Sequence, residues 1–290
     1  MIRFFALVGL ASCGAGVSQH PELDVRCNPT DEFAAPKLVR GLDDGGGVVS
    51  YVRFSPDELT AYFSILDARG NGDIYTSRRP SVTATFGPFV ALSALESAVD
   101  DLSPTVTADG STLYMDSNRS GAYQVLTASW LPADGAFSAP VPIPILDVSS
   151  EGGAYVLPDG SALYFQSARD TGTESSLFRA ARTENGFETP MPLSVNTSNA
   201  ERNAVISPDE KVLYFATNWR NPSLGDGVTD IWMATRASAA DNFGEPVFLD
   251  ALNTPSQELP SWVSPDGCRL YFTRLDSDLR PWVYVAERPR

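Results

Sequence analysis

Hydrophobic and polar positions alternate in short runs along this chain, and the same run recurs five times. Each copy begins at a turn of the type Ser-Pro-Asp, Pro-Asp-Gly or, once, Ala-Asp-Gly, and continues into alternating apolar and aromatic residues. The turn aspartates are separated by 52, 50, 50 and 57 residues, and they are Asp57, Asp109, Asp159, Asp209 and Asp266. Proline fixes φ, aspartate bonds local backbone and glycine accepts positive φ, so these are hairpin turns. No window sustains a period of 3.6 residues, so the pattern predicts an all-β repeat protein.

Each turn is followed by strands of consistent character. One strand of each unit precedes the turn, and the second strand, which follows it, is aromatic and is expected at 61–63, 113–115, 163–165, 213–215 and 270–272. A polar turn containing arginine comes next, and the third strand is expected at 73–75, 123–125, 177–179, 230–232 and 282–284. A last strand begins at Phe86, Phe137, Phe187 and Phe243, and a fifth copy beginning at Phe33 precedes the first turn. These period-2 runs, bounded by Gly, Asn and Asp, are typical of strands.

The displaced fifth copy determines the expected topology. The chain reaches Arg290 just after the third strand of its last repeat, while the strand from Phe33 stands alone at the other end. We expect this N-terminal strand to complete the C-terminal unit and close a ring. Radial repetition of four-stranded antiparallel sheets is a β-propeller. The sequence therefore predicts a five-bladed propeller over residues 32–290, folded as one domain.

The repeat resembles the TolB-type, WD-like β-propeller repeat of bacterial envelope proteins. It is clearest in PDGSALYFQSAR at 158–169 and SPDEKVLYFATNWR at 207–220. The resemblance implies a propeller and implies little about activity. It differs from the Tol protein in having five blades and no separate N-terminal domain. Fold-level analogy alone does not assign an activity.

The N-terminus reads as an export signal. Residues 1–13, MIRFFALVGLASC, place one basic residue before a short apolar run and end in Leu-Ala-Ser-Cys, which resembles the bacterial lipobox. We expect residues 1–12 to be a signal peptide, Cys13 to be lipidated, and residues 13–31 to form a tether. The alternative is an ordinary signal peptide that contains a cysteine. The expected location is the cell envelope, on the periplasmic or surface side of the outer membrane, with a lipid anchor as the only membrane contact.

The other two cysteines suit a closed ring. Cys27 precedes the strand that completes the last blade, and Cys268 lies in the first turn of that blade. Both positions fall at the same end of an up-and-down blade, so a Cys27–Cys268 disulfide is expected in an oxidising compartment. Two free thiols are the alternative.

Composition excludes several classes of function. The 290 residues carry 21 Lys+Arg against 36 Asp+Glu, a net charge of −15, which disfavours nucleic-acid binding. The single histidine, His20, lies in the expected tether, and triads and histidine-ligated zinc sites require more. No phosphate loop, CxxC, HExxH or GxSxG motif occurs. We expect no catalytic residue, no cofactor and no metal; Ca²⁺ is conceivable but no motif supports it.

Acidic residues recur eight positions before four of the turn aspartates. They are Asp101, Glu151, Glu201 and Glu258, and Val49 takes the position in the first repeat. At the head of the innermost strands these carboxylates are expected to face one rim of the central channel, where they could hold a cation or a polyol. The alternative is that each pairs with a blade-turn arginine and holds neighbouring blades together.

One loop departs from the repeat. It runs from 218 to 230 and contains Trp219, Arg220 and Asp226, which could stack on a sugar or grip a partner. Alternatively, Trp219 packs on the next blade.

These observations favour a monomeric, non-catalytic binding scaffold that takes an envelope protein or a glycan. The competing hypothesis is a glycan-cleaving propeller that uses carboxylates at the channel rim.

Overall fold

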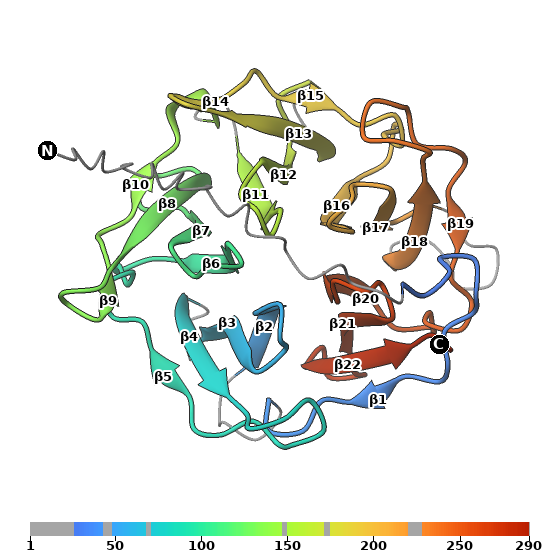
Figure 1. Ribbon diagram of the computed structural model, residues 1–290, viewed down its shortest axis with the longest axis horizontal. Coiled ribbons are helices and arrows are strands. Elements are labelled where there is room, and N and C mark those ends of the chain that lie inside the picture. The colour runs from blue at the N-terminus through green and yellow to red at the C-terminus, as the bar shows by residue number, and fades with distance from the viewer. Residues whose placement is uncertain are drawn as a thin grey trace, which may run out of the picture.

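The fold is a ring of five antiparallel sheets around a central axis (Figure 1). The computed structural model describes residues 26–42, 48–67, 71–146, 150–170, 175–219 and 228–289. Each sheet is one repeat, with its first strand innermost, so the expected five-bladed propeller is confirmed.

The blades follow one another in chain order. Blade 1 contains β2 (Val48–Phe54), β3 (Thr60–Leu66), β4 (Gly72–Arg78) and β5 (Val90–Ala91). Blade 2 contains β6 (Asp101–Val106), β7 (Thr112–Ser117), β8 (Gln124–Leu131) and β10 (Val141–Pro142), with β9 (Ala136–Phe137) extending β8 and η1 (Pro144–Leu146) following. Blade 3 contains β11 (Glu151–Val156), β12 (Ala162–Ser167), β13 (Ser176–Thr183) and β15 (Met191–Pro192), with β14 (Gly186–Phe187) extending β13. Blade 4 contains β16 (Glu201–Ile206), β17 (Val212–Thr217), β18 (Asp230–Thr235) and β19 (Val247–Phe248). Blade 5 contains β20 (Glu258–Val263), β21 (Arg269–Leu275), β22 (Pro281–Glu287) and, from the N-terminus, β1 (Lys37–Leu38).

The ring is closed as the displaced repeat predicts. Strand β1 pairs antiparallel with β22, with Lys37 opposite Val285 and Leu38 opposite Tyr284. The two strands lie side by side at the edge of the ring, blue against red, although they come from opposite ends of the chain (Figure 1). The last blade is therefore built from both ends, and the ring cannot open without breaking this pairing.

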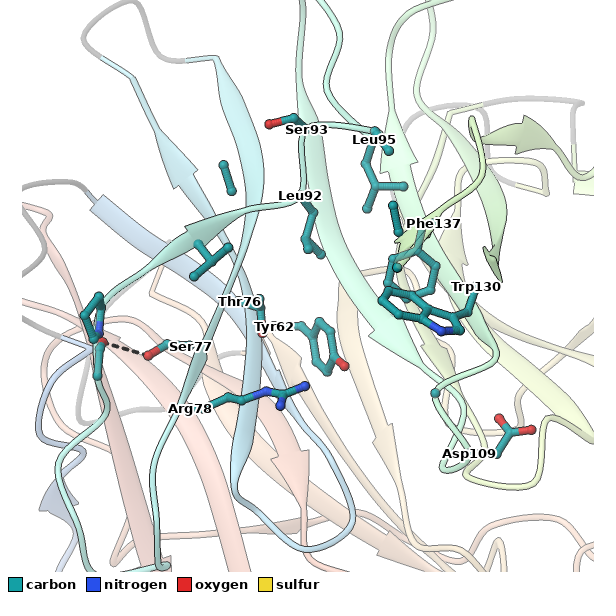
Figure 2. A pocket seen from close by; sticks show the side chains of 18 residues that line it. Tyr62, Thr76, Ser77, Arg78, Leu92, Ser93, Leu95, Asp109, Trp130 and Phe137 are labelled. Atoms are coloured by element: carbon teal, nitrogen blue, oxygen red, sulfur yellow. Dashed lines mark hydrogen bonds between the residues drawn. The ribbon is translucent and has the colours of Figure 1, made fainter. Parts of the chain in front are cut away.

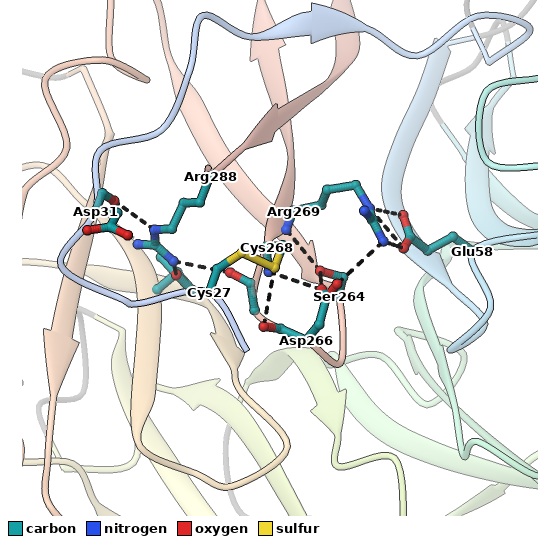
Figure 3. Close-up of a disulfide and its surroundings, with 10 residues drawn as sticks. Cys27, Asp31, Glu58, Ser264, Asp266, Cys268, Arg269 and Arg288 are labelled. Carbon is teal, nitrogen blue, oxygen red and sulfur yellow. Dashed lines mark hydrogen bonds and ion pairs between the residues drawn. A yellow bond between two sulfur atoms is a disulfide. The ribbon is translucent and has the colours of Figure 1, made fainter. Parts of the chain in front are cut away.

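A disulfide covalently ties the same closure. Cys27 and Cys268 are bonded with their Cα atoms 5.0 Å apart, which confirms the expected pair (Figure 3). Arg288 donates hydrogen bonds of 2.9 Å to the backbone carbonyls of Pro29 and Asp31. Residues 26–31, expected to belong to a tether, thus contact blade 5, and the folded part begins earlier than residue 32.

The core lies between blades, because each blade is covered on both faces by its neighbours. Successive side chains of a strand point to opposite faces, so the second strands bury a tyrosine on one side and Phe or Met on the other. Tyr114 and Phe165, for example, are both 0% exposed. The aromatic triplets of the sequence are thus the packing surfaces between blades.

Candidate functional site

The four periodic acids do not form an open rim. They stand at the first residue of the inner strands, as expected, but their exposed fractions are only 0–1%. Asp101, Glu201 and Glu258 are therefore not exposed to the channel as expected. Glu151 is also buried, but it lines the cavity at the channel mouth.

Three of these acids are held by arginines of their own blades. Their Arg–carboxylate distances are 2.6 Å for Arg119–Asp101, 3.0 Å for Arg169–Glu151 and 2.7 Å for Arg274–Glu258. Arg119 and Arg169 follow the second strand, as the periodicity suggested, whereas Arg274 lies within it, in β21. Each pair joins two parts of one blade. Arg119 and Arg274 also donate hydrogen bonds of 2.8 Å to the carbonyls of Leu95 and Leu252, in the segments that lead in from the preceding blades. Their local effect is to fix the turn against the head of the inner strand.

Trp219 binds the fourth of these acids, Glu201. Its indole N–H donates to Oε1 of Glu201 at 2.9 Å, and its ring packs edge-on against Trp232 at 5.0 Å between centroids. Trp232 belongs to the same blade, so Trp219 packs within blade 4 and not on the next one. The two other candidates of this loop, Arg220 and Asp226, lie outside the described residues.

The mouth of the channel beside these acids is a polar cavity of about 420 Å³. Every blade contributes to its lining. Its polar and aromatic walls include Tyr51, Ser103, Asp116, Tyr123, Gln166, Arg202, Asn203 and Gln257. Amide, guanidinium and phenol groups of this kind suit a ligand rich in hydroxyl groups.

A backbone irregularity repeats around this mouth. The inner strands of blades 1–4 each carry a β-bulge whose first residue has positive φ, at Tyr51 (53°), Ser103 (52°), Gly153 (61°) and Asn203 (52°). Three of these four are not glycine, so the conformation is strained. Bulges re-aim side chains and free backbone groups, and they are common beside binding sites.

Asp116 is the most perturbed acid at this mouth. Its Oδ2 accepts a hydrogen bond of 2.7 Å from the N–H of Gly153 in the next blade. Burial raises its pKa to about 7, against the opposing effects of a hydrogen bond from Ser103 and of backbone N–H groups. Asp116 is thus partly protonated near neutral pH and can donate as well as accept.

A second site emerges from the way neighbouring blades are joined. At four of the five interfaces the tyrosine of the second strand meets an arginine that ends the third strand of the next blade. The hydroxyl–guanidinium contacts are Tyr114–Arg182 at 2.5 Å, Tyr164–Arg236 at 3.1 Å, Tyr214–Arg288 at 2.6 Å and Tyr271–Arg79 at 3.1 Å. We call this contact the Tyr–Arg tie. Each tie arginine also lies over the phenylalanine that begins the fourth strand, as Arg236 lies over Phe243 at 4.3 Å.

The interface between blades 1 and 2 lacks this tie. Trp130 takes the place of the arginine. Its backbone N–H donates to the carbonyl of Ser111, just as the backbone N–H of Arg182 donates to the carbonyl of Ser161 in blade 3. Among the described residues, no arginine therefore hydrogen-bonds the hydroxyl of Tyr62, although the charge of Arg78 acts on it. Figure 2 shows Tyr62 and Trp130 facing each other across the resulting gap.

This gap is a groove of about 720 Å³, which we call the blade 1–2 groove. Its walls are mainly apolar and include Tyr62, Val90, Leu92, Leu95, Trp130 and Phe137 (Figure 2). Trp130 remains 39% exposed and Val90 57% exposed. Arg78 and Asp109 lie at its margin and are exposed. A solvent-facing tryptophan in an apolar hollow with charged edges is typical of a protein-binding surface.

The sequence contained the signal for this groove, although the repeat analysis did not use it. Arg79 and Arg236 stand seven positions before the phenylalanine of the last strand, and Arg182 stands five before it. Trp130 stands at the seventh position in its own repeat. Repeat comparison located the shared elements, whereas the functional information lay in the position where one repeat differs. Asp116 was missed for the same reason.

The described residues contain no cluster of three or more His, Cys, Asp or Glu side chains arranged to hold a metal ion. Within the same residues, no helix has the length and apolar character needed to span a membrane.

Comparisons with known proteins agree with the fold. At the level of sequence, no protein-family model and no curated protein matches the chain. Among solved structures, a protein assigned as TolB from Agrobacterium tumefaciens aligns with 90% of this chain and 91% of its own, at 15% identity and a TM-score of 0.50. The chain covers only 55% of TolB from Acinetobacter baumannii, at 13% identity and a TM-score of 0.48.

Other solved structures with a similar fold are proteins of different kinds. The α-L-arabinofuranosidase PaAbf62A from Podospora anserina, solved with cellotriose, aligns with 90% of this chain and 97% of its own, at 12% identity and a TM-score of 0.57. A chain of the nidogen–laminin complex aligns with 89% of this chain and 92% of its own, at 12% identity and a TM-score of 0.50. At these identities the likeness shows a TolB-like β-propeller fold, shared by binding proteins and glycoside hydrolases alike.

Proposed function

We propose that this chain is a non-catalytic binding propeller that holds a segment of a partner protein in the blade 1–2 groove. The observation that carries the proposal is the replacement of the tie arginine by Trp130 at this one interface. The other four interfaces show that the fold readily closes such a gap with arginine. An open, apolar gap with an exposed tryptophan costs stability, and such costs are retained where binding needs them.

The chemistry of the groove indicates the kind of segment it would take. Trp130, Tyr62 and Leu92 offer an apolar pocket for an aromatic or branched side chain. Arg78 is exposed at one edge and Asp109 at another, so each can pair with a charge flanking that side chain. Buried aromatic anchors surrounded by a polar rim provide most of the binding energy in protein interfaces.

Hydrolysis is disfavoured by the state of the carboxylates. Glycoside hydrolysis needs two carboxyl groups flanking the scissile bond across an open cleft. The four periodic acids are instead buried, and three of them are paired with arginines. Asp116 has the raised pKa of an acid catalyst, but it contacts the backbone of the next blade.

A second candidate function is glycan binding at the channel mouth. The polar lining around Asp116, Gln166 and Asn203 favours it, together with the likeness to a structure solved with cellotriose. In this form the chain would bind a sugar without cleaving it.

The cellular setting is also a proposal. We infer export and lipidation at Cys13 from the sequence of residues 1–13, and the disulfide supports an oxidising compartment. Labelling with a fatty-acid analogue should mark the wild-type chain and leave Cys13→Ser unmarked. Equal labelling of both would contradict this part.

Selection from a random peptide library tests the main proposal. The full chain should enrich peptides with an aromatic or branched anchor, and a photoreactive group in that anchor should crosslink to the groove between β4 and β8. Crosslinking at the channel mouth would transfer the function to the second candidate. Failure to enrich any peptide would contradict the proposal.

The second candidate needs a separate probe. Xylotriose, cellotriose and a peptidoglycan disaccharide-peptide can be titrated into the full chain by calorimetry, with Arg202→Ala at the mouth and Trp130→Ala in the groove as matched variants. Binding lost only in Arg202→Ala supports a sugar site at the mouth. Release of shorter sugars during the titration would show hydrolysis and would contradict a non-catalytic role.

A further inference from the structure

Arg53 is a buried charge at the axis of the ring. It lies in β2, the inner strand of blade 1, and is 2% exposed. The equivalent residues of the other inner strands are Thr105, Tyr155, Val205 and Trp262. Arginine at this depth is therefore particular to blade 1 and not part of the repeat.

The guanidinium of Arg53 is largely unsatisfied. Nη1 makes one long hydrogen bond of 3.4 Å, to the carbonyl of the preceding residue. Nε and Nη2 have no hydrogen-bond partner among the described residues, and Arg53 forms no ion pair there. The ring of Tyr155 lies 5.4 Å from the guanidinium carbon.

A buried arginine in this state lacks compensation for its lost hydration. Burial lowers the pKa of Arg53 to about 10, against the opposing effects of Tyr155, Asp116 and Tyr51, and the group stays charged at neutral pH. Asp116 acts on Arg53 without an ion pair or hydrogen bond, and its own raised pKa leaves it only partly ionised near neutral pH. A buried charge without a close partner costs several kcal/mol, and one cation–π contact offsets only part of this. A negative charge close to Arg53 would reduce this cost.

A cavity of matching size adjoins the guanidinium. It measures about 20 Å³ and has otherwise mostly apolar walls, among them Phe54, Val106, Tyr155 and Trp262. A volume of about 10–15 Å³ is enough for one water molecule, so this cavity holds one species of roughly that size. Sulfate, phosphate and organic carboxylates are too large for it.

A larger hollow lies beside this cavity at the turn end of the channel. It measures about 1300 Å³, and the two share Pro56, Ala108, Pro158, Pro208 and Pro265. Asp57, Asp109 and Asp159 also line this outer hollow. Their carboxylates disfavour multivalent anions, so the site selects a small monovalent one.

We propose that Arg53 and the cavity beside it form a binding site for a single halide-sized anion, with chloride as the natural occupant. The anion neutralises the guanidinium and accepts hydrogen bonds from Nε and Nη2. It thereby acts as a structural plug at the axis, where the inner strands of all five blades meet. This site lies apart from the blade 1–2 groove, so the two proposals stand or fall separately.

Bromide is the probe for a direct test. Crystals of the full chain soaked in sodium bromide should show an anomalous peak within hydrogen-bonding distance of Nε and Nη2 of Arg53. Density without anomalous signal at this place would identify a water molecule and overturn the proposal.

A solution measurement uses the melting temperature in sodium chloride and in sodium gluconate of equal ionic strength. Wild-type protein should melt about 2–4 °C higher in chloride, as expected when a ligand binds the folded state alone. Arg53→Met should lose this difference, whereas Arg202→Met, an exposed arginine at the opposite mouth, should keep it. A chloride effect that persists in Arg53→Met would overturn the proposal. If that variant fails to fold, the bromide peak in the wild-type protein decides.

Discussion

Asp116 of blade 2 and Gly153 of blade 3 are joined across the channel mouth by a hydrogen bond of 2.7 Å, from the backbone N–H to the carboxyl group. Gln166 makes the corresponding bond of 3.1 Å to the N–H of Asn203, one blade further on. The bulge that frees each N–H and the side chain that accepts it thus come from neighbouring repeats. Because Gln166 is neutral, a charge is not needed for this bond, and only Asp116 makes it pH-dependent.

The raised pKa of Asp116 predicts a pH-dependent stability. Its pKa is near 4 when unfolded and about 7 when folded, so the folded state holds the proton more tightly. The contribution of Asp116 to stability should therefore be greatest below pH 4 and fall as pH rises to 7, by on the order of a few kcal/mol. Asp116→Asn removes this titration and should exceed wild type in stability at pH 8, by more than at pH 4. Urea unfolding at both pH values measures this.

The control for that experiment is Asp134→Asn, an exposed turn residue, which should match wild type at both pH values. A stability difference between wild type and Asp116→Asn that does not change with pH would contradict the assignment.

The disulfide should contribute strongly to the stability of the closed ring. It links residues 241 positions apart and ties the first folded residues to blade 5. Removing a native disulfide commonly costs about 2–5 kcal/mol, and long loops lie at the upper end of the entropic estimate. The double variant Cys27→Ser/Cys268→Ser should unfold at lower guanidinium concentration. Wild type with a reducing agent should match it, and an unchanged midpoint in both would show that β1 pairing alone closes the ring.

Glu151 should behave as a structural residue. Its carboxylate is buried and pairs with Arg169, so Glu151→Ala leaves a charge without its partner and should cost about 3–5 kcal/mol. Glu151→Gln keeps the shape and should cost less. Neither change should alter the affinity of the folded protein for a groove-binding peptide. A sugar-cleaving activity that disappears in Glu151→Gln at unchanged stability would instead restore the hydrolase hypothesis.

The blade 1–2 interface should accept the arginine that the other interfaces use. In Trp130→Arg the guanidinium can reach the Tyr62 hydroxyl and lie over Phe137, as Arg236 does with Tyr164 and Phe243. We expect a gain of about 1 kcal/mol, or a melting temperature about 2–4 °C higher. In Tyr62→Phe/Trp130→Arg the hydrogen-bonded part of the gain should vanish. A lower melting temperature for Trp130→Arg would show that the tie cannot form there.

The ring could be predicted from the sequence because the features that build it recur. Turn aspartates, aromatic strands and last strands that begin with phenylalanine each appear five times, and the topology follows from the position of the fifth last strand, at Phe33. The partner of Cys27 followed from the same argument. Repetition could not show that Glu151 points into its own blade, since that depends on where the arginine of the turn reaches.

The binding sites were harder to foresee, because they lie where the repeat fails. Trp130 resembles any other aromatic residue of a strand until it is compared with the tie arginines at the equivalent positions of the other four blades. Arg53 looks like an exposed polar position of an alternating strand. The bulge in β2 changes the alternation and directs this side chain to the axis, which no pattern of apolar and polar residues reveals.

The central claim, that the blade 1–2 groove is the binding site, is tested most directly by one affinity comparison. A peptide selected on the full chain is titrated into wild type and into Trp130→Arg. We expect this variant to fold and to be more stable than wild type. The proposed function predicts an affinity at least tenfold weaker for Trp130→Arg, because the arginine fills the groove. Equal affinity for both proteins would contradict it.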